Sequence, residues 1–146
     1  MNFSNRHNLF YRAVITWLLF IPVVFANAAI RDLLYKPYTG ELPAHQISTV
    51  TASLAFVLLA HFVIRDCLYS ASTIRLWLIG LLWVALTVTF EFALGRLVTG
   101  ASWNKLLYDY NVFKGRIWTL LLLTLLVTPF IVRYMSYKRS KFHFSN

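Results

Sequence analysis

The sequence predicts an all-α fold: a polytopic membrane protein that forms a bundle of four transmembrane helices from two helical hairpins. Of its 146 residues, 59% are apolar and only 13% are charged, whereas soluble domains contain about 25% charged residues. Four apolar runs approach the roughly 20 residues that a helix needs to cross a bilayer. Backbone polar groups cannot remain unpaired in hydrocarbon, so runs of this length are expected to be helices within one membrane domain, residues 1–146.

The first two predicted spans carry no formal charge, and each ends at an arginine. Ala13 to Ile30 lies between Arg12 and Arg31, and Ile47 to Ile64 ends at Arg65. Such boundaries are typical of transmembrane helices, because basic side chains remain at the level of the lipid headgroups.

The third and fourth predicted spans form the second hairpin. Leu76 to Gly95 contains one ionisable residue, Glu91, and Ile117 to Val132 consists mainly of Leu, Val and Thr. A basic tail, residues 133–146, follows the fourth span.

A signal peptide is the alternative interpretation of the N-terminal segment. Ala26-Asn27-Ala28 matches the small-x-small pattern of a signal-peptidase site. The apolar run that precedes it is longer than the 7 to 15 residues of a usual signal h-region. We therefore expect a retained membrane helix, while cleavage would leave three spans.

The net charge of +9 would suggest a nucleic-acid partner in a soluble protein. Among long apolar runs, basic residues instead set membrane topology and contact anionic lipids, so we expect lipids and no nucleic acid as partners. With both termini in the cytoplasm, eight basic residues lie inside and six outside. The basic tail favours cytoplasmic termini, because basic residues close to a helix end have the largest effect on membrane orientation.

The two halves of the chain resemble each other weakly. An offset of 65 aligns Phe25, Ala28 and Arg31 with Phe90, Ala93 and Arg96. In each half a span ends near an Arg, and a polar loop leads to the next span. This pattern indicates either a parallel repeat or a coincidence between two ordinary hairpins.

The predicted loops differ in composition. Residues 31–46 are too rich in Pro and Gly to form one helix, so we expect a packed loop with aromatic anchors. Residues 100–111 can form one short amphipathic turn in the membrane interface, because Trp103, Leu106, Leu107 and Tyr110 follow helical spacing.

Glu91 is the most informative single residue, because an unpaired carboxylate inside a membrane helix is costly. It is expected to be neutral, paired or directed into a polar cavity, with Arg31 or Arg116 as the favoured partner. A structural ion pair that joins helix ends is the alternative to a functional role.

Other polar residues are assigned to the same membrane face as Glu91. They could bind an anionic or zwitterionic ligand, relay a proton, or simply satisfy one another. The candidate ligand-binding residues are Arg31, Asp32, His45, Gln46, Glu91, Arg96, Trp103, Asp109, Tyr110, Asn111, Arg116 and Trp118.

Several site types are not expected. The single cysteine, Cys67, rules out an intramolecular disulfide and a cysteine-based metal cage. His61 has no second ligand at i+3 or i+4, so we expect no metal and no cofactor. The phosphate-binding motifs G-x-x-x-x-G-K-[ST] and G-x-G-x-x-G are absent from the sequence.

The second half of the chain contains a series of short motifs: Phe90-Glu91-Phe-Ala-Leu-Gly95-Arg96, Ser102-Trp103, Leu106-Leu107, Asp109-Tyr110-Asn111, Gly115-Arg116 and Trp118. This series resembles a family of small uncharacterised bacterial membrane proteins with four predicted helices. The resemblance covers about residues 88–130. It implies a bacterial inner-membrane location and a common site formed by eight of the candidates above, and it implies no activity.

These observations favour a non-enzymatic membrane protein that binds a small polar ligand or a lipid headgroup, or that acts as a subunit of a homo-oligomer or larger membrane complex. The alternative is a proton-linked transporter or channel subunit that uses Glu91. A lipid- or quinone-modifying enzyme with Asp109 or His45 as general base ranks last.

Overall fold

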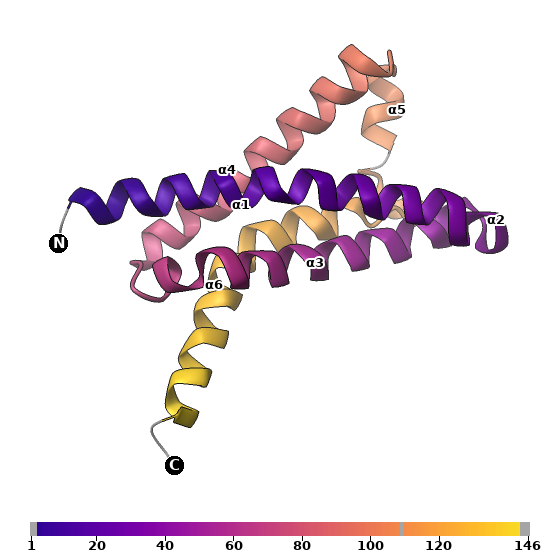
Figure 1. The fold of residues 1–146 in the computed structure, drawn as a ribbon. Helices are drawn as coiled ribbons and strands as arrows, with labels where there is room; N and C mark the ends of the chain where they lie inside the picture. The colour runs from indigo at the N-terminus through magenta and orange to yellow at the C-terminus, as the bar shows by residue number, and fades with distance from the viewer. Residues whose placement is uncertain (1–2, 109, 144–146) are drawn as a thin grey trace.

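The computed structural model describes residues 3–108 and 110–143, with side chains for 8–104, 106–108 and 110–137. The described chain is helical almost throughout (Figure 1). Four helices are long and apolar enough to cross a membrane, which confirms the predicted all-α bundle and the multi-pass membrane protein.

The first hairpin consists of two long helices joined by a short helical connection. α1 (Phe3–Ile30) continues into a π-helical turn, η1 (Arg31–Tyr35), and then into α2 (Lys36–Thr39). The chain breaks at Gly40, whose φ of 84° is left-handed, and α3 (Glu41–Tyr69) follows. α3 therefore begins six residues before the span predicted from Ile47. Pro43 is compatible with this early start because the first turn of a helix needs no intrahelical N–H donor.

The second hairpin repeats this order of elements. α4 (Thr73–Ala93) continues into a second π-helical turn, η2 (Leu94–Val98), and a short helix, α5 (Trp103–Tyr108), follows. α5 confirms the helical turn expected in this loop. A 3₁₀ turn, η3 (Val112–Lys114), then leads to α6 (Trp118–His143). The two hairpins share the order of long helix, π turn, short helix and long helix, while η3 has no counterpart in the first hairpin. This order is consistent with either a parallel repeat or two ordinary hairpins.

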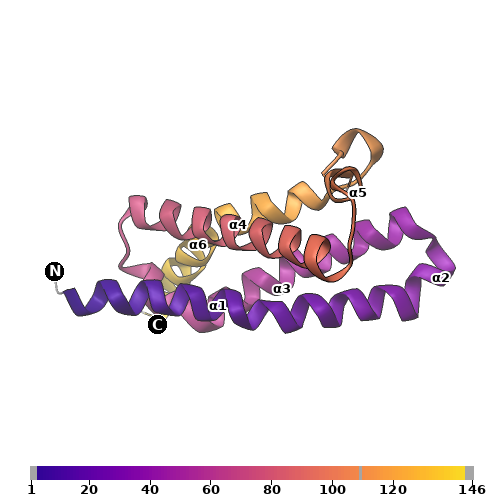
Figure 2. The same cartoon turned by 90° about the horizontal axis from the view of Figure 1, so that it is seen from above.

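The long helices contact one another to different extents. α3 packs along both α1 and α6, and α6 packs along α4, whereas α1 and α4 contact each other over a short stretch. Figures 1 and 2 show α4 inclined to α1, and Figure 1 shows the last turns of α6 pointing away from the bundle. Pro129 lies within α6, where it removes a backbone hydrogen bond and bends the helix.

An aromatic cluster in the core marks the place where α1 crosses α4. Phe20 and Trp83 both contact the buried ring of Phe56 edge to face, at centroid distances of 4.6 and 4.9 Å. The Trp17 indole N–H donates to the Thr87 hydroxyl at 2.9 Å, and the Trp83 N–H donates to the Ala13 carbonyl at 2.8 Å. These two bonds join α1 to α4 at the crossing.

Candidate functional site

Glu91 lies in the last turn of α4 and accepts two hydrogen bonds from side chains that are distant in sequence. Its Oε2 accepts the Tyr110 hydroxyl at 2.5 Å and the Trp118 indole N–H at 2.8 Å. Both donors are neutral, and they belong to the second loop and the start of α6. The carboxylate therefore ties the end of α4 to the chain segment that returns into the membrane.

Aromatic contacts hold the second loop against the same end of α4. The Phe92 ring lies 5.8 Å from that of Trp103 and 5.9 Å from that of Tyr110. The Arg96 guanidinium stacks over Trp103 at 5.6 Å and donates to the Ala101 carbonyl at 3.1 Å. These contacts explain why Trp103 of α5 and Tyr110 lie against the end of α4.

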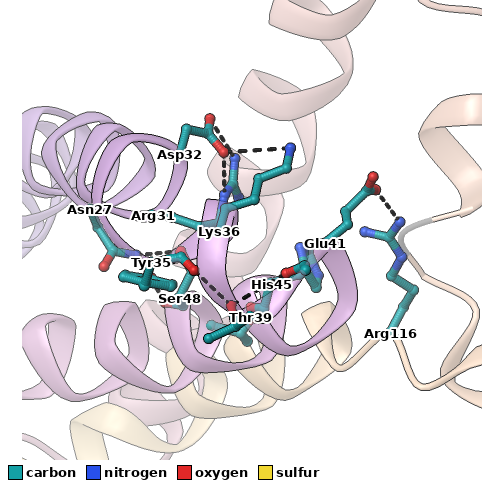
Figure 3. Close-up of polar contacts among 12 residues, drawn as sticks. Asn27, Arg31, Asp32, Tyr35, Lys36, Thr39, Glu41, His45, Ser48 and Arg116 are labelled. Atoms are coloured by element: carbon teal, nitrogen blue, oxygen red, sulfur yellow. Dashed lines mark hydrogen bonds and ion pairs between the residues drawn. The ribbon is translucent and has the colours of Figure 1, made fainter.

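Arg116 joins the second loop to the start of α3. Its NH2 group lies 2.7 Å from Glu41 Oε1 (Figure 3). Its guanidinium stacks over the Tyr108 ring at 4.9 Å. The Gln46 side-chain amide donates to the Gly115 carbonyl at 2.9 Å. The Arg116 side chain is only 12% exposed and the Glu41 side chain 64%, so the pair lies at the rim of the bundle.

Arg31 has a carboxylate partner on its own element. Its Nε lies 3.0 Å from Asp32 Oδ1, and the Lys36 ammonium lies 3.7 Å from the same oxygen (Figure 3). We expected Arg31 or Arg116 to pair with Glu91. The structure instead shows ion pairs of these arginines with Asp32 and Glu41, and it shows aromatic donors on Glu91.

A pocket of about 450 Å³ opens between α1 and α4 beyond their crossing. Its walls are mainly apolar and include Trp17, Phe20 and Phe90. Polar residues of η1, α3 and α4, and one residue just after η2, also line it: Arg31, His45, Thr87, Glu91 and Thr99. His45 is buried, and its ring lies 6.3 Å from that of Trp118, which also lines the pocket. The pocket thus combines an apolar body with several polar groups.

The structure brings four of the sequence candidates into this pocket: Arg31, His45, Glu91 and Trp118. Seven others lie outside its lining, namely Asp32, Gln46, Arg96, Trp103, Tyr110, Asn111 and Arg116. Asp109 lies outside the described residues. Two of these seven contact a candidate in the lining: Tyr110 bonds to Glu91 and Asp32 pairs with Arg31.

Sequence reasoning missed the apolar half of the pocket. Trp17, Phe20 and Val24 follow one face of α1 at helical spacing, and this pattern was available. It does not distinguish a pocket wall from ordinary core packing, because both require apolar side chains on one face.

Metal binding finds no support in the described part of the chain, where no group of three His, Cys, Asp or Glu residues could hold an ion. Comparisons with protein-family models, curated proteins and solved structures gave no match. No residue role is therefore taken from the resemblance to bacterial four-helix proteins, and the site rests on its own geometry.

Proposed function

We propose that this chain binds a phospholipid with a zwitterionic headgroup in the pocket between α1 and α4. One observation carries the proposal: a single pocket has aromatic and aliphatic walls, an arginine on η1 (Arg31) and a carboxylate on α4 (Glu91). Its volume of about 450 Å³ lies within the usual range for ligand sites.

The chemistry of the lining matches such a lipid. An acyl chain gains free energy against Trp17, Phe20 and their apolar neighbours by dispersion and close packing. Arg31 offers charge-assisted hydrogen bonds to a phosphate, and Glu91 offers an acceptor to an ammonium group. A headgroup with both charges offers a phosphate to Arg31, which also pairs with Asp32, and an ammonium to Glu91.

Lipid binding tests this proposal directly. Native mass spectrometry of the purified protein would measure binding of phosphatidylethanolamine, with diacylglycerol as the ligand that lacks a charged headgroup. We expect Arg31→Gln to weaken phosphatidylethanolamine binding about tenfold, because hydrogen bonds to charged groups contribute about 1.5 kcal/mol or more. Diacylglycerol binding should be unchanged by this substitution.

Two further variants make the test specific. Lys114→Gln removes a positive charge at the same end of the molecule but outside the pocket, and should bind like the wild type. Val24→Trp fills the pocket and should reduce binding of both lipids. Equal phosphatidylethanolamine affinities for Arg31→Gln and Lys114→Gln would exclude the headgroup position, and full binding by a folded Val24→Trp variant would exclude the pocket.

A proton-linked transporter or channel subunit is the second candidate function. The position of Glu91 on the wall of a membrane pocket favours it, because intramembrane carboxylates often serve proton transfer. Proton flux into proteoliposomes distinguishes the two functions. A transporter loses flux in Glu91→Gln, whereas a lipid-binding protein shows no flux in either form.

The location proposed for the chain is the bacterial inner membrane, with both termini in the cytoplasm. This orientation is supported by the basic residues beyond the last span and at the start of the first. It places the pocket in the outer leaflet. The chain acts there alone, as a homo-oligomer, or as a subunit of a membrane complex.

A further inference from the structure

A second groove lies along the contact between α1 and α4, on the other side of their crossing. It has a volume of about 580 Å³ and is lined by Leu9, Phe10, Ile74, Arg75, Leu78, Ile79 and Leu82. No lining residue is shared with the first pocket. Two hydrogen bonds, from Trp17 to Thr87 and from Trp83 to Ala13, join α1 to α4 at the crossing and separate the groove from the pocket.

The shape of this groove suits an extended hydrocarbon chain. Its floor is buried, since Leu9 is 6% and Ile79 is 5% exposed. Its rims remain exposed, with Phe10 at 60%, Ile74 at 64% and Leu78 at 60%. A membrane-spanning chain presents these rims to lipid, so an acyl chain can enter sideways between the two helices.

The charge at this groove differs from that at the first pocket. Arg75 is the one charged residue in its lining, and no ion pair to it is found among the described residues. No Asp or Glu lines the groove, so nothing in it neutralises Arg75.

The start of α4 adds to this positive field. α4 begins at Thr73, two residues before Arg75, and helix N-termini carry a partial positive charge. The first turn of α4 contains no acidic residue that would offset this charge. The headgroup end of the groove is therefore cationic, while the first pocket contains both signs of charge.

We infer that this groove is a binding site for an anionic phospholipid, with one acyl chain between α1 and α4 and the phosphate beside Arg75. The headgroup is one that carries a net negative charge, as in phosphatidylglycerol. This site is independent of the zwitterionic lipid proposed for the first pocket, because the two spaces share no lining residue.

Binding of phosphatidylglycerol to the purified full chain tests the inference, with phosphatidylcholine as the zwitterionic comparison. The wild type should bind phosphatidylglycerol more tightly. In Arg75→Gln, we expect the affinity for phosphatidylglycerol to fall about fivefold, toward that for phosphatidylcholine, because one basic residue is lost next to an anionic headgroup.

Control variants separate a specific site from general attraction to a basic protein. Arg133→Gln removes a charge outside the groove and should retain the preference for phosphatidylglycerol. Leu78→Trp obstructs the groove and should weaken binding while leaving the first pocket intact. Equal losses in Arg75→Gln and Arg133→Gln would overturn the inference, as would undiminished binding by Leu78→Trp.

Failure here is distinguishable from failure of the proposed function. Arg75→Gln should leave phosphatidylethanolamine binding at the first pocket unchanged, and Arg31→Gln should leave the phosphatidylglycerol preference unchanged. If Arg31→Gln alone removed the preference for phosphatidylglycerol, the anionic lipid would belong to the first pocket.

Discussion

Glu91 shows how neutral donors can hold a carboxylate at the end of a membrane helix. The Tyr110 hydroxyl and the Trp118 indole N–H both reach its Oε2. Each donor loses its acceptor if the side chain becomes apolar, and an unsatisfied buried polar group costs about 1–3 kcal/mol. The contribution of Glu91 to stability therefore depends on oxygen acceptors as well as on charge.

This arrangement predicts different effects for two substitutions. Glu91→Leu should lower the free energy of unfolding by about 2 kcal/mol, because two donors are left without acceptors. Glu91→Gln keeps a side-chain oxygen that can accept both bonds and should cost less than about 1 kcal/mol. Unfolding in a denaturing detergent titration measures both. Equal destabilisation by Leu and Gln would mean that the charge itself is required.

The sequence singled out Glu91 but not the donors that hold it. A lone carboxylate in an apolar run is conspicuous because of its desolvation cost, and this signal is local. Its partners lie 19 and 27 residues further along the chain. Arginines were expected because opposite charges attract, whereas the folded loop presents aromatic O–H and N–H groups at this depth.

At the scale of helix pairs, α4 approaches the backbone of α6 closely at Gly80. A Cβ atom built on Gly80 would lie 2.3 Å from the backbone oxygen of Leu126. Backbone cannot move aside as a side chain can, so the helices must separate to accept any larger residue. Small residues at such points allow membrane helices to pack through van der Waals contact.

Gly80→Ala should therefore destabilise the bundle by about 1–3 kcal/mol, the usual cost of overpacking. Gly95→Ala is the matched control. Its Cβ would also lie 2.3 Å from a neighbour, but that neighbour is the Cδ2 atom of Leu106, at the end of a flexible side chain. We expect Gly95→Ala to cost less than about 1 kcal/mol. Comparable losses in the two variants would contradict the close backbone approach of α4 and α6.

The crossing of α1 and α4 gives a second prediction at this scale. Thr87→Val keeps the shape of the side chain but removes the acceptor of the buried Trp17 indole N–H. The expected loss is about 0.6–1.5 kcal/mol, the range for hydrogen bonds between membrane helices and in soluble proteins. Thr124→Val is the control, since the Thr124 hydroxyl bonds within its own helix to Leu120. The difference in unfolding free energy between the variants measures the contribution of the crossing.

The four spans could be predicted at this scale because hydrocarbon requires long apolar runs, and each predicted run coincides with one long helix, apart from Ile117, which precedes the first residue of α6. The residues at which the helices begin and end could not be predicted. Pro and Gly indicated a loop before Ile47, yet α3 begins at Glu41, because Pro43 is tolerated in a first turn and Gly40 alone supplies the break. The inclination of α4 to α1, which creates both pockets, leaves no periodic signal in the sequence.

For the whole molecule, an even number of spans places both termini on one side of the membrane. The two inter-helix loops of the hairpins then lie together on the other side, with the turn between α3 and α4 opposite them. Exposed positions suited to labelling occur on each predicted side: Phe113, which is 99% exposed, and Thr39 on one, and Ser70 on the other. The basic tail predicts that Ser70 faces the cytoplasm.

Cysteine labelling of bacterial spheroplasts, which have a sealed inner membrane and express the chain, tests this arrangement. In a Cys67→Ser background, a membrane-impermeant maleimide should label Phe113→Cys and Thr39→Cys from outside, and Ser70→Cys only after permeabilisation. The reverse pattern would keep the four spans but invert the orientation, and would move the zwitterionic pocket to the inner leaflet. Labelling of Ser70→Cys and Phe113→Cys from the same side would contradict the fold itself, because the turn between α3 and α4 and the second loop would no longer lie on opposite sides of the bilayer. The two lipid sites depend on this result in different ways: their chemistry is unaffected by inversion, whereas the leaflet from which each draws its lipid is exchanged.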